Sequence, residues 1–161
     1  MLRLFLILAL SLASPMHASD DLDFLGAADH TDFPLQFEVL RTIPFAGKVV
    51  KEGDSIKRKM DKSSFVLEKG KYLITFSTEV QVNGVALTIT NFIMRAVSVS
   101  GTVDQPSFTE VAYPPHRSRY MISFSKIIEI SDEKATLSMT AFNQLGSTTL
   151  KKRSITITKL R

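Results

Sequence analysis

Apolar and polar residues alternate along most of the chain from residue 65 onward. In residues 70–82 one face carries a regular apolar row: Tyr72, Ile74, Phe76, Val80 and Val82. A period of two indicates β-strands that bury one side, because successive side chains of a strand point to opposite faces. The same alternation predicts further strands over 35–39, 85–100, 120–130, 135–141 and 154–160.

Turn residues separate these runs. Residues 68–70, 131–133 and 144–147 are expected to form turns, and Asn83-Gly84 predicts a tight hairpin because both residues tolerate positive φ. In the strand after that hairpin, the buried row is expected to be Val85, Leu87, Ile89, Ile93, Val97 and Val99, which leaves Phe92 and Met94 outside. Many short strands without an amphipathic helix indicate an antiparallel two-sheet β-sandwich.

The N-terminal residues have the layout of a secretory signal peptide. Arg3 precedes an apolar run over residues 4–13, and Ser14-Pro15 ends that run before the small residues Ala18 and Ser19. We expect cleavage after residue 18, with cleavage after Ser14 and a buried N-terminal helix as the alternatives. Residues 19–32 are acidic and without pattern, which predicts a flexible leader before a single domain over 33–161.

The amino-acid composition limits the partners and the cellular compartment that we expect for this domain. The formal net charge of +4 is mild, so nucleic acid is not an expected partner, and no later segment is apolar enough to span a membrane. The chain has no cysteine, so the domain must be held by packing or by oligomerisation. It also has no Asn-x-Ser/Thr acceptor site, and both absences favour a bacterial periplasmic or secreted protein.

Several of these strands carry more specific motifs. Phe65 and Leu67 precede Gly70, which is followed by Tyr72-Leu73-Ile74, and the chain ends in an Ile-Thr-Ile-Thr-Lys-Leu strand over 155–160. Over residues 34–161 the chain resembles the jelly-roll domains of the tumour necrosis factor and complement globular-head superfamily, which has bacterial members. The resemblance implies a jelly roll of about 8–10 strands, for which an immunoglobulin-like sandwich is the rival.

The resemblance also implies a homotrimer. The residues expected at its interface are Leu73, Thr75, Met121, Ile127 and Leu160. Thr75 departs from the family pattern, because it stands where cytokine members carry an aromatic residue at the three-fold axis.

Residue types for catalysis are scarce. The three histidines, at positions 17, 30 and 116, are far apart in the sequence, and no Gly-x-Ser-x-Gly motif occurs. Asp132 and Glu133 lie in a predicted turn, where carboxylates are normally solvated. The sequence therefore predicts no catalytic residue, no metal and no cofactor, with a hydrolase that uses an unrecognised site as the alternative.

Two segments could bind a ligand. The first is a proline-containing loop that could stack on a sugar or hold an anion, through Tyr113, His116, Arg117, Arg119 and Tyr120. The second is a polyanion patch that would form if two basic runs meet: Lys57, Arg58, Lys59, Lys151, Lys152 and Arg153. The alternatives are an ordinary loop with solvated arginines, and edge lysines that prevent strand aggregation. The expected function is thus an exported, non-catalytic module that binds a glycan, a polyanion or a protein surface.

Overall fold

The chain forms ten β-strands and no helix in the part that the structure, a computed structural model, describes, which is residues 23–160 apart from 85, 102, 116 and 117. The strands are β1 (Phe24–Asp29), β2 (Phe33–Leu35), β3 (Arg41–Thr42), β4 (Val49–Glu52), β5 (Ile56–Arg58), β6 (Ser64–Val82), β7 (Thr88–Ser98), β8 (Val103–Tyr113), β9 (Arg119–Leu145) and β10 (Thr148–Leu160). All pairs of named strands are antiparallel. The predicted antiparallel β-sandwich of about 8–10 strands is therefore confirmed.

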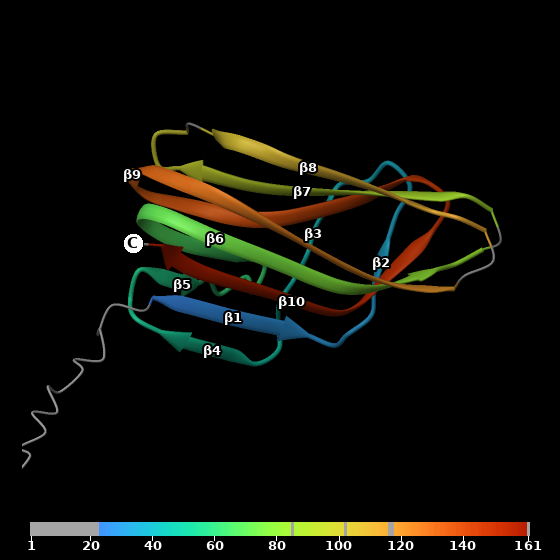
Figure 1. The fold of residues 1–161 in the computed structure, drawn as a ribbon, viewed down its shortest axis with the longest axis horizontal. Helices are drawn as coiled ribbons and strands as arrows, with labels where there is room; N and C mark the ends of the chain where they lie inside the picture. The colour runs from blue at the N-terminus through green and yellow to red at the C-terminus, as the bar shows by residue number, and fades with distance from the viewer. Residues whose placement is uncertain (1–22, 85, 102, 116–117, 161) are drawn as a thin grey trace, which may run out of the picture.

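Two long strands connect the layers of the sandwich (Figure 1). The second part of β6 pairs with the first part of β9, beside β10, β1 and β4. The second part of β9 pairs with β7, which pairs with the edge strand β8. The turns predicted at 68–70 and 131–133 are absent, because β6 and β9 are paired with each other on both sides of these residues and meet there in a bulge between Glu68 and Gly70. The polar residues lie at this bend rather than at chain reversals.

Aromatic rings fill the space between the layers. Phe76 on β6 lies 5.7 Å from Phe92 on β7 and 5.3 Å from Phe124 on β9, measured between ring centroids. Phe45, from the segment between β3 and β4, extends this cluster to Phe65 and Phe76. Since edge-to-face and tilted ring pairs add to the energy of area burial, this cluster is the centre of the core.

The buried face of β7 is the opposite of the one predicted. Phe92 and Met94 lie in the core, whereas Leu87 and Val99 are exposed. This strand carries apolar residues on both faces, so its alternation does not indicate which face is buried. The prediction of a hairpin at Asn83-Gly84 is also wrong, because β6 and β7 are not paired with each other. The connection between them passes from one layer to the other.

The domain begins earlier than residue 33. Within the predicted leader, Phe24–Asp29 forms β1, which pairs with β10 on one side and β4 on the other. Leu25 and Ala27 point into the core, and the Asp29 carboxylate is buried against Arg153. The prediction of a flexible leader is therefore wrong for this stretch, because pairing on both sides stabilises a strand whose small residues carry little signal. The predicted signal peptide lies outside the described residues.

Candidate functional site: an uncharged sheet face

The middle of the outer face of the β4-β1-β10-β6-β9 sheet is built from small and hydroxyl-bearing side chains. Inward positions of these strands fill the core, so their alternate positions face outward. Cross-strand pairing aligns two rows of outward residues: Gly26, Thr156, Thr75 and Ser125, then Ala28, Ser154, Ser77 and Ser123. Hydroxyl groups bond across the strands, at 2.7 Å between Thr75 and Ser125 and 2.8 Å between Ser77 and Ser123.

Apolar residues lie on both sides of these two rows. Leu73 pairs with Ile127 beside Thr158 and Phe24, and Leu160 lies one outward position further along β10. Met121 lies on the other side of the two rows, near the start of β9, with 71% of its surface exposed, and Ile127 is 52% exposed. The five residues predicted for a trimer interface thus share this one face.

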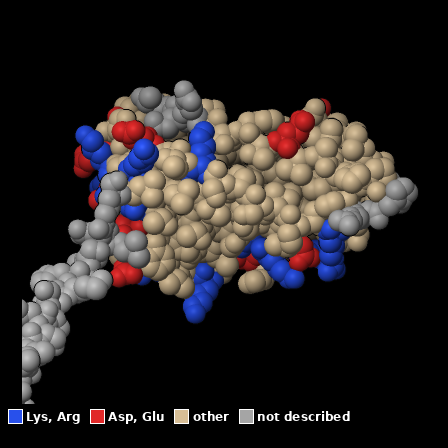
Figure 2. Space-filling model, viewed as in Figure 1, with Lys and Arg blue, Asp and Glu red and all other residues tan. Residues whose placement is uncertain are grey.

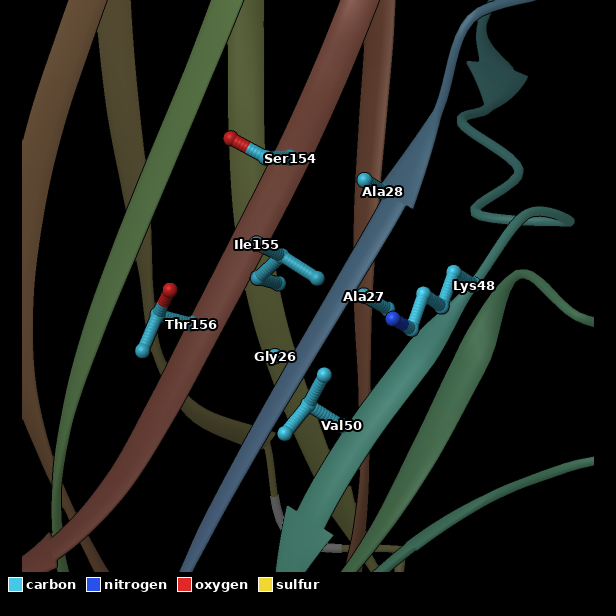
Figure 3. Close-up of a pocket in the computed structure, with 8 residues that line it drawn as sticks. All are labelled: Gly26, Ala27, Ala28, Lys48, Val50, Ser154, Ile155 and Thr156. Carbon is cyan, nitrogen blue, oxygen red and sulfur yellow. The ribbon is translucent and has the colours of Figure 1, made fainter.

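A shallow hollow of about 240 Å³ opens on the same face (Figure 3). It is lined by Gly26, Ala27, Ala28, Lys48, Val50, Ser154, Ile155 and Thr156. Gly26 creates the hollow, because a Cβ atom there would have nothing closer than the Val50 carbonyl oxygen at 4.0 Å. Apart from the Lys48 ammonium group, the lining offers only methyl groups, hydroxyls and backbone, which suits an uncharged side chain.

Charged groups lie at both ends of the face: Lys71 and Glu129 pair beside Leu160 at one end, and a cluster surrounds Glu79 at the other. The nearly buried Glu79 forms ion pairs with Lys152 at 2.8 Å and Arg119 at 3.5 Å. The hydrogen bond from Lys152 and the two positive charges lower the pKa of Glu79, despite the opposing effect of desolvation. A second depression of about 230 Å³ lies here, lined by Glu79, Arg119, Tyr120 and Met121. In Figure 2 the middle of the visible surface likewise carries few charges, which gather at its ends and margins.

The predicted ligand loop is only partly open to solvent. Tyr113 is buried, its ring packs at a tilt against that of Tyr120 with 4.9 Å between centroids, and burial raises its pKa. The Tyr120 hydroxyl donates to the Pro114 carbonyl oxygen. Tyr113 is thus a core residue rather than a ligand contact, and Arg119 is directed at Glu79. The other two predicted residues, His116 and Arg117, lie outside the described residues.

The two basic runs do approach each other, but they do not form one exposed patch. Arg58 donates to the carbonyl oxygens of Phe45 and Gly47, and Arg153 donates to that of the neighbouring Pro44. Arg153 is completely buried, which corrects its assignment to a polyanion site. Lys151 and Lys152 are paired with Asp32 and Glu79. Lys57 and Lys59 remain exposed on and beside β5.

No group of three or more His, Cys, Asp or Glu residues among those described could hold a metal ion. In the described segments no helix has the length and hydropathy needed to cross a membrane.

Comparisons with known proteins identify the fold. No protein-family model matches the chain, and no curated protein matches it significantly. Among solved structures, the Eiger TNF of S. frugiperda aligns with a TM-score of 0.57 at 9% identity, covering 86% of this chain and 94% of that one. Murine APRIL aligns with a TM-score of 0.53 at 7% identity, covering 82% of this chain and all of that one.

A virus structure aligns equally well. The infectious bursal disease virus Gt strain gives a TM-score of 0.56 at 12% identity, over 86% of this chain and 32% of the viral one. At these identities the likeness shows the fold alone, which is a TNF-like jelly roll.

Proposed function

We propose that the protein is an exported, non-catalytic binding module of the TNF-like jelly-roll type that associates with itself as a homotrimer. The observation that carries this proposal is the uncharged face of the β4-β1-β10-β6-β9 sheet. Its function would be to present the remaining surface to a glycan, a polyanion or a protein partner outside the cell. Export rests on the sequence of residues 1–18, and a bacterial origin on the absence of cysteine and of glycosylation acceptors.

The composition of this face is unusual for a surface exposed to water. The chain has 20 Lys and Arg and 16 Asp and Glu, yet the two central rows across β1, β10, β6 and β9 contain none. An antiparallel sheet with one solvated face normally alternates apolar residues inside with polar and charged residues outside. Packing further copies of the chain against this face would desolvate hydroxyls that already bond to each other and no central charge, so it would avoid the main penalty of burying polar surface.

Self-association would also compensate for the absence of disulfide bonds. Without disulfides, a secreted domain gains stability from burying apolar side chains such as Met121 and Ile127 against further copies. A cyclic arrangement would use all copies equally and leave no unpaired face. The similarity of fold to the Eiger TNF and APRIL structures is consistent with this proposal.

Light scattering and sedimentation test the assembly. We expect a mass of three chains at micromolar concentration, and we expect Ile127→Lys to reduce it to one chain, because three ammonium groups would be desolvated near one axis. Phe108→Lys is the matched control: Phe108 is 58% exposed, comparable to Ile127, but it lies on β8 in the other layer. A wild-type mass of one chain would refute self-association. A trimer that Phe108→Lys breaks and Ile127→Lys does not would refute the assigned face.

A further inference from the structure

Asn83-Gly84 ends β6 and begins the crossing to the other layer. Both residues are exposed. The Asn83 backbone amide donates to the Ser147 carbonyl oxygen at 2.8 Å, and its carboxamide Nδ2 donates to Thr149 Oγ1 at 3.0 Å. A Cβ atom built on Gly84 would meet no atom within 4 Å apart from its chain neighbours, so the space beside the Gly84 Cα atom is open.

We propose that Asn83 is a site of spontaneous deamidation. The Gly84 amide nitrogen attacks Cγ of Asn83, forming a new C–N bond and a five-membered ring. The Cγ–Nδ2 bond breaks, and ammonia leaves with the proton that the Gly84 nitrogen loses. Water then adds to either carbonyl of the succinimide and opens it, which yields aspartate or isoaspartate. The sum consumes one water and releases one ammonia, and it needs no cofactor or oxidant.

Glycine makes this step accessible at position 83. It has no side chain to hinder the attacking nitrogen, and it adopts backbone conformations that other residues avoid. Gly84 has φ of 150°, inside the region that favours glycine. Among the described residues the exposed carboxamide makes one hydrogen bond, to Thr149, and breaking this one bond allows it to rotate toward the main chain.

The two other asparagines provide a contrast within the same chain. Asn91 and Asn143 are fully buried in paired strands and precede Phe92 and Gln144. The Asn143 carboxamide accepts bonds from Thr90 and Thr148 and donates to the Leu35 carbonyl oxygen. Sheet pairing holds their backbones extended, so cyclisation at either residue would require local unfolding.

The product would change the connection between the layers. A carboxylate at position 83 adds one negative charge beside Thr149, whose hydroxyl then has to donate rather than accept. Isoaspartate also lengthens the main chain by one carbon atom between β6 and β7.

Peptide mapping of the folded protein tests the proposal. Cleavage after Lys71 and Arg95 gives one peptide, residues 72–95, that contains both Asn83 and Asn91. After incubation at mildly alkaline pH, we expect fragment masses to show conversion at position 83, as a mixture of aspartate and isoaspartate, with Asn91 and Asn143 unchanged. Incubation in denaturant should raise conversion at Asn91 and Asn143 by removing their protection.

Asn83→Gln is the matched variant, because it keeps the amide but would need a larger ring. We expect loss of the modification in this variant with an unchanged melting temperature, and a several-fold slower reaction in Gly84→Ala. Conversion at Asn91 or Asn143 in the folded protein at the rate of Asn83 would overturn the proposal, as would an intact Asn83 after prolonged incubation.

Discussion

Arg153 is the largest completely buried side chain in the described part of the molecule, and it joins three segments of the chain. Its guanidinium group donates to the carbonyl oxygens of Thr31 at 2.7 Å and Leu150 at 3.0 Å, and forms an ion pair with Asp29 at 3.2 Å. Burying this charge is tolerated because each of its three nitrogen atoms meets an acceptor. The pair therefore fixes the end of β1 against a bulge in β10.

Removing the Asp29 charge should be costly. We expect Asp29→Asn to lower the free energy of unfolding by about 3–5 kcal/mol, because the Arg153 charge would remain buried without its partner. Asp32→Asn is the control: its partner Lys151 is also cationic, but the Asp32 side chain is 62% exposed, so about 0–1 kcal/mol is expected. Urea unfolding measures both. Equal losses would show that the buried pair does not stabilise the domain.

The same carboxylate predicts how stability depends on pH. Burial opposes ionisation of Asp29, but hydrogen bonds from Thr31 and Ala46 and the Arg153 charge outweigh it and lower its pKa from 3.8 to about 2. Because the folded state holds this proton more weakly than the unfolded state, the contribution of about 2 kcal/mol is present above pH 3.8 and lost as the pH falls toward 2. Acid titration of the unfolding free energy should show this loss in the wild type and a smaller one in Asp29→Asn.

At the scale of elements, β1 depends on its neighbours more than on its own sequence. Its outward positions include Gly26 and Ala28, which have low strand propensity, yet it pairs along its full length with β10. A chain that begins at residue 33 would lose Leu25, Ala27 and Asp29 from the interior. We expect that chain to be unfolded or aggregated, because the edge of β10 would be open.

A chain that begins at residue 19 is the control for this truncation. It keeps the whole of β1, so it should unfold with the same melting temperature as the longer chain. Circular dichroism distinguishes the two cases. A stable chain beginning at residue 33 would contradict the role given to β1.

At the scale of the whole molecule, the hollow over Gly26 tests whether the uncharged face is covered. Gly26→Leu should fill the hollow without an internal clash, since the nearest atom to a Cβ there is 4.0 Å away. If other copies cover this face, the larger side chain should weaken association several-fold while the melting temperature of the separated chain stays the same. Sedimentation velocity over a range of concentrations measures the change.

Ser138→Leu is the corresponding control for that experiment. Ser138 is a small, half-buried residue at an outward position in the other layer, where it pairs with Arg95. The Ser138→Leu substitution should leave association between chains unchanged. Equal effects of the two substitutions would mean that neither face is specific.

The sequence by itself determined the fold class and the residues of the strongest strands. The alternation over residues 70–82, 120–130 and 154–160 places Tyr72, Phe124 and Ile157 inward, because one buried face leaves a period of two in the residue types. It also identified the exposed Met121 and Ile127, since apolar residues opposite a core row stand out from their polar neighbours.

Only the tertiary structure decided which residues meet. β7 is apolar on both faces, so the choice of Phe92 over Ile93 for the core depended on its partners in the facing layer. β1 and the buried Arg153 are stabilised by contacts with segments more than a hundred residues away, such as that from Arg153 to Thr31, and no local pattern encodes these. The uncharged face arises in the same way, because its rows combine residues from strands that are far apart in sequence and become neighbours only through sheet pairing.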